Sequence, residues 1–245
     1  MKSTAIASRE AELIDAIEAT DVIVFRPRDV TRFLDISDRN AYRILGNMTE
    51  KGLVTRLQRG VYVLSETYDR LDSYELASAL EPASYIGYWS ALHLHHRTDQ
   101  VPRTIFLAST TQKRPLTIQG QQVRFVRVSP NSFFGYERSG NVVLSDPEKT
   151  IIDCLRLPEH AGGLRHIDRA MDDDLDGERL TAYARRLDNG AVAARLGYLC
   201  DRHEIAVDRD VLSDLIGSYS KLDPAGERTN LHPEWHLYVN VDLDA

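Results

Sequence analysis

Apolar residues recur at helical spacing three times near the start of the chain. One such segment follows Ser8, a second opens at Pro27, and a third ends at Gly52. Because proline fits the first turn of a helix and glycine commonly follows the last one, this pattern predicts three helices. Ser8 and Ser37 are the expected caps of the first and third helices, and a short turn over residues 35–37 joins the last two. The positions at helical spacing are Ala11, Ile14, Ile17 and Glu18 in the first segment, Val30, Phe33 and Leu34 in the second, and Ala41, Ile44, Leu45 and Met48 in the third.

The next stretch has the pattern of a hairpin. Two short apolar runs, 53–57 and 61–64, flank a turn that contains Gly60, and glycine accepts the positive φ that a tight turn requires. We therefore predict two antiparallel strands with the basic side chains of Arg56 and Arg59 at or near their tip. Three helices followed by a basic hairpin are the order of a winged helix-turn-helix.

The predicted third helix carries a polar face opposite its apolar one. Arg39, Arg43, Asn47 and Glu50 fall on that face, and Asn40 and Tyr42 lie on its flanks. Arginine can form two hydrogen bonds with guanine and asparagine two with adenine, while tyrosine can reach a phosphate. A solvated amphipathic helix would show the same pattern, but the basic hairpin that follows favours binding to double-stranded DNA. The residues expected to contact DNA are Arg26, Arg28, Ser37, Arg39, Asn40, Tyr42, Arg43, Asn47, Lys51, Arg56 and Arg59.

From residue 66 onward the pattern mixes strands and helices. We therefore predict an α+β protein, with a winged helix-turn-helix over residues 1–65 and a mixed α/β domain with a helical second half over residues 66–245. The apolar residues 22–25 are expected as a short strand or a buried connector. The further elements expected are a helix before Pro82, a helix after Gly87 with Trp89, Leu92 and His96, strands at 104–109, 122–128 and 141–146, a helix capped by Asp146 with Ile151, Ile152 and Leu155 inward, several helices from 163 onward, and a last strand at 235–241.

Composition limits the class of protein. The chain has 245 residues, of which 42% are hydrophobic and 27% charged, as in ordinary globular proteins. No run approaches the ~20 apolar residues that cross a bilayer, and charges from Arg9 onward interrupt any signal-peptide core. Cys154 and Cys200 lack a metal-binding or redox spacing and are expected as buried, reduced thiols. These features predict a cytoplasmic protein without a membrane partner.

The distribution of charge along the chain is uneven. The net charge is −7 overall, yet residues 22–65 carry a net charge of +4 and residues 66–245 one of −8. This asymmetry suggests one surface that meets phosphates. Residues 97–128 are also basic. This stretch is interpreted as a solvated sheet face, with a second phosphate-contacting surface or a docking face for an acidic partner as the alternatives. Their basic residues are Arg97, Arg103, Lys113, Arg114, Arg124 and Arg127.

Other candidate chemistry is weaker. The histidines with spacings of three or four residues invite a metal site, but no cysteine or carboxylate completes a known zinc pattern, so we expect no metal. The acidic run 172–176 lacks the preceding Gly-Ser turn of a nucleotidyltransferase and is expected as a solvated helix end with a cap at Asp174 or Asp176. Neither a nucleophile elbow nor a phosphate-binding loop is present, so we expect no enzyme and no cofactor. The histidines concerned are His93, His95, His96, His232 and His236.

Several blocks of the chain resemble a known family. The series RGVYVL at 59–64, YIGYWSALHLHH at 85–96, TIFLAS at 104–109 and LSDPEKTIIDCLRLPEHAGGL at 144–164 is similar to the AbiEi antitoxins and transcriptional regulators of abortive-infection, type IV toxin–antitoxin systems. The resemblance extends over nearly the whole chain. It implies an N-terminal domain that represses its own operon by binding the promoter, and a C-terminal domain that counters a nucleotidyltransferase-like toxin, directly or indirectly.

Two other functions remain open at this point. Related regulators without a toxin share the same blocks, so the chain is alternatively a stand-alone winged-helix regulator whose C-terminal domain senses a ligand or mediates assembly. A nuclease or nucleotidyltransferase with a DNA-targeting module is the alternative from the enzyme class. The gene immediately downstream would discriminate among these functions.

Overall fold

The structure, a computed structural model of the chain, describes residues 6–244 and mixes helices with several sheets, as the α+β prediction requires. It divides into two compact units. The first comprises the described residues up to Pro82 together with Pro115–Val123, and the second comprises Ala83–Arg114 and the residues from Arg124 onward. The predicted domain boundary between residues 65 and 66 stays a prediction.

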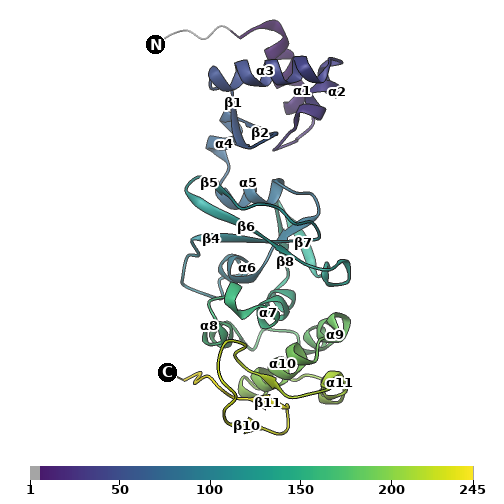
Figure 1. The fold of residues 1–245 in the computed structure, drawn as a ribbon, viewed down its shortest axis with the longest axis vertical. Coiled ribbons are helices and arrows are strands. Elements are labelled where there is room, and N and C mark those ends of the chain that lie inside the picture. The colour runs from purple at the N-terminus through teal and green to yellow at the C-terminus, as the bar shows by residue number, and fades with distance from the viewer. Residues whose placement is uncertain (1–5, 245) are drawn as a thin grey trace. The chain divides into compact units, whose positions relative to one another are not determined.

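Three helices open the first unit, as their apolar spacing predicts (Figure 1). They are α1 (Ser8–Glu18), α2 (Pro27–Leu34) and α3 (Asp38–Glu50). Pro27 occupies the first turn of α2, and Asp35, with a φ of 48°, ends that helix in the left-handed region. Gly52, with a φ of 72°, follows the end of α3, where a positive φ favours glycine. Ser37 is the N-cap residue of α3, but its side chain makes no capping hydrogen bond.

The first helix differs from its prediction in two respects. Its N-cap residue is Ala7 rather than Ser8, because the Glu10 carboxylate accepts a hydrogen bond from the Ala7 N–H and thereby satisfies the start of the helix. The buried apolar positions are Leu13 and Ile17, whereas Ala11 is exposed. Glu18, the last of the predicted positions at helical spacing, is exposed as well. The apolar stripe of this helix is therefore displaced from the predicted one toward Leu13.

The predicted hairpin is present as β1 (Val54–Gln58) and β2 (Val61–Leu64), which pair antiparallel. Gly60 has a φ of 74° in the two-residue turn. The register shifts between Arg56 and Gln58, so the first strand bulges near its tip. Phe25 forms a single antiparallel bridge with Tyr62, so the residues before α2 are a buried connector attached to the hairpin rather than a full strand.

One hydrophobic core joins these elements. It contains residues from all three helices, the connector and both strands, including the four predicted inward positions of α3. The first unit continues with α4 (Ser65–Arg70), α5 (Ser73–Ala79) and a short pair formed by β5 (Leu116–Ile118) and the start of β6 (Gln121–Arg127). The Gln119 amide donates to the carbonyls of Tyr68 and Leu71, which ties the turn of this pair to α4.

The largest sheet has the strand order β5-β6-β4-β3-β8-β7. Its central strand β3 pairs antiparallel with β4 and parallel with β8. The strands not yet bounded are β3 (Ser84–Ile86), β4 (Thr104–Ser109), β7 (Tyr136–Ser139) and β8 (Val142–Ser145). The predicted strands at 104–109, 122–128 and 141–146 correspond to β4, β6 and β8, whereas β3, β5 and β7 were not predicted.

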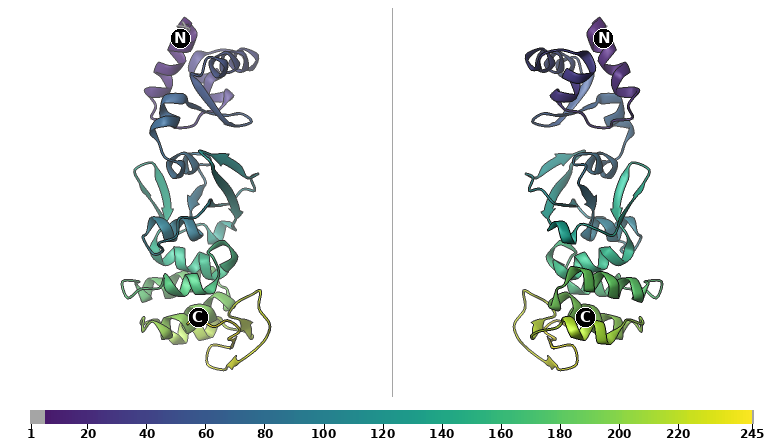
Figure 2. Two further views of the ribbon diagram at one scale, coloured as in Figure 1. Left: turned by 90° about the vertical axis from the view of Figure 1, so that its left-hand side faces the viewer. Right: turned by 90° about the vertical axis from the view of Figure 1, so that its right-hand side faces the viewer.

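Helices pack beside this sheet and continue to the C-terminal part of the second unit, where α9, α10 and α11 lie side by side in both views of Figure 2. Their bounds are α6 (Tyr88–Leu94), α7 (Pro147–Arg156), α8 (Leu164–Arg169), α9 (Gly177–Leu187), α10 (Gly190–Arg202) and α11 (Arg209–Leu215), with short 3-10 turns at Pro130–Ser132 and Pro158–His160. The last sheet consists of β9 (Ser220–Lys221), β10 (Leu231–His232) and β11 (Leu237–Tyr238). The expected strand at 235–241 is thus only two residues long, and His96 lies beyond the end of α6.

Three polar side chains are buried together in the second unit. Lys149 and Asp153 form an ion pair on α7 with both side chains fully buried. The Lys149 ammonium also donates to Tyr85 Oη at 3.0 Å, and Tyr85 Oη donates to the Asp153 carboxylate at 2.8 Å. Burial lowers the pKa of Lys149 and raises that of Tyr85. Each buried polar group therefore depends on the other two for its hydrogen bonds.

Candidate nucleic-acid interface

The exposed face of α3 carries the side chains that the sequence marks for base contact. Ala41, Ile44, Leu45 and Met48 are all buried, which confirms the predicted inward face. On the other side, Arg39, Arg43 and Asn47 are exposed, and neither arginine forms an ion pair with a described residue. Tyr42 exposes 58% of its surface although it is a large hydrophobic residue. The flanking residue Asn40 is exposed too.

The hairpin presents a second basic element. Arg56 and Arg59 are both exposed, and the Arg56 Nε donates to the Gln58 carbonyl at 3.3 Å. The bulge at Leu57 and the positive φ of Gly60 shape the tip on which these two arginines stand. A phosphate near this tip would therefore meet two exposed guanidinium groups that form no ion pair with a described residue.

The N-terminus of α3 and the exposed side of α2 carry further polar side chains. Ser37 is exposed and its hydroxyl makes no capping bond. Arg28 exposes 78% of its side chain, with its Nε 4.0 Å from the Asp29 carboxylate. Arg32, which the sequence analysis did not select, exposes 77% of its side chain on the same helix. Arg32 follows Arg28 by one helical turn, and this spacing is the signal that could have found it.

Arg26 and Lys51, expected to contact DNA, are engaged inside the first unit. The Arg26 guanidinium donates to the Leu80 carbonyl at 2.9 Å. The Lys51 ammonium lies 2.7 Å from the carboxylate of Glu10, which is only 3% exposed. The hydrogen bond from Lys51 is the main cause that lowers the pKa of Glu10. These two basic residues therefore hold the ends of α2 and α3 in place.

Glu10 is the positioning residue that the sequence analysis missed. It receives the Ala7 N–H at the start of α1 and the Lys51 ammonium at the end of α3, so one carboxylate joins both helices. The local signal was available, since a glutamate in the third position of a helix commonly caps its own N-terminus. Its long-range bond to Lys51 has no counterpart in the sequence pattern.

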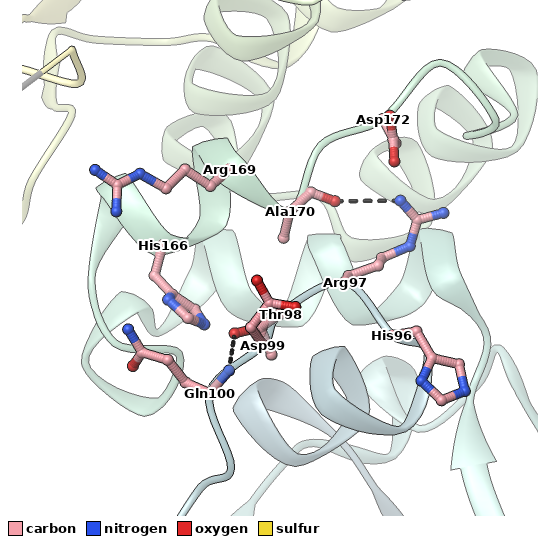
Figure 3. A pocket seen from close by; sticks show the side chains of 9 residues that line it. All are labelled: His96, Arg97, Thr98, Asp99, Gln100, His166, Arg169, Ala170 and Asp172. Carbon is pink, nitrogen blue, oxygen red and sulfur yellow. Dashed lines mark hydrogen bonds between the residues drawn. The ribbon is translucent and has the colours of Figure 1, made fainter.

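The basic residues expected at 97–128 do not form one surface. Arg97 exposes only 7% of its side chain and donates to Asp174 at 2.6 Å and to the Ala170 carbonyl at 3.2 Å, the second of which Figure 3 draws. Arg124 and Arg127 point to opposite faces of β6, because side chains three residues apart in a strand alternate. Exposed Arg103 and Arg114 form no ion pair with a described residue. Lys113 is partly buried.

The predicted helix-capping aspartates and the two cysteines have structural roles in the second unit. Asp176 caps α9 by accepting from the N–H groups of Glu178 and Arg179, as expected for one of the two cap candidates. Asp146 caps α7 by accepting from the Lys149 N–H. Cys154 and Cys200 are both buried and free, and burial raises the pKa of each thiol.

The histidines are dispersed. The His95 Nε2 lies 2.7 Å from the Ser145 carbonyl, while the His232 and His236 rings contact Tyr198 and Tyr219. Within residues 6–244, no group of three or more His, Cys, Asp or Glu residues is placed to hold a metal ion. None of the described helices has the length and apolar character needed to span a membrane.

Comparison with known proteins gives a fold and a family match. The crystal structure of the RV2827C protein from Mycobacterium tuberculosis is similar, with a TM-score of 0.61 and 17% sequence identity over 95% of this chain and 92% of that chain. At that identity the likeness shows the fold alone. No curated protein matches the chain.

The family match lies in the first unit and includes α2, α3 and both strands of the hairpin. It also includes the block RGVY, whereas the other blocks that carry the resemblance lie outside the matched residues. Over residues 12–65, the chain matches the family described as "Transcriptional regulator, AbiEi antitoxin", which confirms the resemblance there.

Proposed function

We propose that α1 to β2 form a winged helix-turn-helix that binds double-stranded DNA, and that the chain regulates transcription. The observation that carries this proposal is the division of α3 into a fully buried apolar face and an exposed face with Arg39, Arg43 and Asn47. The match of residues 12–65 to transcriptional regulators supports it.

In the proposed complex α3 enters the major groove. The N-terminal residues of such a helix reach base edges, and Arg39, Asn40 and Arg43 lie in its first two turns. Hydrogen bonds from arginine to guanine and from asparagine to adenine would supply the sequence preference. Arg56 and Arg59 on the hairpin would neutralise phosphates, which fixes the protein on the duplex without reading sequence.

The salt dependence of DNA binding tests the proposed surface. Contact with about five or six phosphates should give a log–log slope of binding constant against salt near −5, since each contact contributes about −0.9. Replacement of Arg56 and Arg59 together by alanine should flatten that slope by roughly 2. Titration of fluorescent promoter DNA at several salt concentrations measures both values. A slope close to zero would show that this surface does not meet the phosphates.

We further propose that the chain represses its own operon and acts as an antitoxin against a nucleotidyltransferase-like toxin. The support is the resemblance, together with the size of the part beyond residue 65, which exceeds what DNA binding requires and carries a net charge of −8. Neither role assigns catalysis to this chain. The second candidate is a stand-alone regulator whose second unit senses a ligand, and the cavities of that unit favour it.

Growth rescue distinguishes these two roles. Expression of a nucleotidyltransferase-like gene from immediately downstream should arrest growth, and co-expression of the full chain should restore it. The Arg39→Ala/Arg43→Ala variant should still rescue growth from an independent promoter, because it alters only the DNA-binding surface. Absence of such a gene, or of rescue by the intact chain, would favour the stand-alone regulator.

A further inference from the structure

A cavity of about 340 Å³ lies in the second unit between α6 and the loop that leads into β4. Apolar side chains form much of its lining: Trp89 of α6, Val101 and Pro102 of the loop, and Phe106 of β4. Val101 exposes 65% of its surface. The cavity therefore offers apolar and aromatic surface to a ligand from solvent.

The Trp89 side chain has an unsatisfied polar atom at this place. Its indole N–H is buried and has no hydrogen-bond partner among the described residues. The His166 ring lies beside the indole, at 4.9 Å between centroids, and His166 lines a second cavity of about 330 Å³, which Figure 3 draws. Gln100 lines both cavities, so the loop 96–103 borders the two of them.

Two arginines give this region a positive charge. Arg103 lines the cavity, is exposed and forms no ion pair with a described residue. Arg124 shares a face of β6 with Val126, which packs in the same core cluster as Phe106. Arg124 also lies near His160, whose ring stacks on that of Phe106 with 5.1 Å between the centroids. Burial lowers the pKa of His160. The charge of Glu159 opposes this shift, and the charge of Arg124 adds to it.

The lining also contains a carboxylate that can act as a hydrogen-bond acceptor. Glu159 is exposed at the cavity and forms no ion pair with a described residue. A carboxylate in such a position can accept a hydrogen bond from the amino group of a base, as it does from cytosine in DNA complexes. Apolar and aromatic side chains bind the faces of bases, and arginine binds phosphate.

We propose that this cavity binds a nucleotide with an amino-bearing base, its base against Trp89, Pro102 and Phe106 and its phosphate toward Arg103 and Arg124. Glu159 accepts from the amino group of the base. The chemistry fits because exposed arginines beside an apolar and aromatic cavity are complementary to a ligand that is both aromatic and anionic. This site goes beyond the proposed DNA binding and does not depend on it.

Tryptophan fluorescence of the full chain tests the site, because the chain has two tryptophans and Trp235 is only 1% exposed. Titration with GMP should change the emission in a saturable way, UMP should bind more weakly, and inorganic phosphate should bind weakest. Arg103→Ala and Arg124→Ala should each raise the dissociation constant for GMP roughly tenfold, the worth of one charge-assisted hydrogen bond. Trp89→Phe should remove the emission change.

The matched control is Arg138→Ala, which removes the same charge from exposed β7, three strands from β4 in the sheet order. It should leave the dissociation constant unchanged, and calorimetry should reproduce the values obtained by fluorescence. Absence of saturable GMP binding, or equal binding of GMP and phosphate, would overturn the proposal. Loss of promoter affinity in Arg103→Ala without any nucleotide binding would overturn it too, and would assign that arginine to DNA.

Discussion

Replacement of Arg39 and Arg43 by alanine should remove most of the sequence-specific DNA affinity of this protein. Each guanidinium stands exposed on α3 above a buried apolar face, so its loss should leave the helix folded while removing a two-bond contact with a base. A contact of that kind contributes roughly 1–3 kcal/mol to discrimination, so each single change should weaken specific binding by about 5- to 150-fold. Gel-shift titration with the protein's own promoter measures this loss.

Two further variants separate base contact from general charge. Arg59→Ala on the hairpin should weaken binding to specific and unrelated DNA by similar factors, because a phosphate contact carries no sequence information. Arg9→Ala removes the same charge from α1, where Arg9 pairs with Glu12, and should leave promoter affinity nearly unchanged. If the double variant of Arg39 and Arg43 retains full promoter affinity, α3 is not the recognition helix.

The largest loss of stability is expected for Asp153→Ala. This change leaves the Lys149 ammonium buried without its counter-charge and removes the acceptor of the Tyr85 hydroxyl. Breaking a buried ion pair by removing one partner typically costs about 3–5 kcal/mol of unfolding free energy. Urea denaturation, followed by circular dichroism, measures the loss.

A charge-neutral replacement of the whole pair provides the comparison. Lys149→Met with Asp153→Leu and Tyr85→Phe should recover much of that loss, because neither an uncompensated charge nor an unpaired hydroxyl remains in the core. Asp210→Ala on the exposed side of α11 should change the unfolding free energy by no more than about 0.5 kcal/mol. A loss below about 1 kcal/mol in Asp153→Ala would show that the buried pair is not required for folding.

Local patterns predicted the first unit well. The inward face of α3 follows from residues three and four apart, which always share a face of a helix, and all four predicted positions are buried. The stop at Gly52 and the turn at Gly60 also depend on local backbone geometry, since both have positive φ. The sequence therefore determined the candidate DNA-contacting helix and hairpin, and with them the exposed side chains of the proposed site.

Short edge strands were harder to predict. All four residues of β7 are exposed, and β5 has only three residues, so neither has the alternation of buried and exposed side chains that marks a strand. Each of these strands is stabilised by hydrogen bonds to one neighbouring strand, and that pairing depends on the tertiary fold. The first position of α1 was mispredicted for a related reason, because Glu10 rather than Ser8 satisfies its N-terminus.

What only the tertiary structure decided is which charged residues remain available to a ligand. Arg97 looked like part of a basic surface, yet its partner Asp174 lies 77 residues further along the chain. Lys51 looked like a phosphate contact, yet it is bonded to Glu10, 41 residues before it. A charge in a sequence has the same formal value whether it is solvated or paired. Burial and distant partners therefore determine its role, and these arise only when the chain folds.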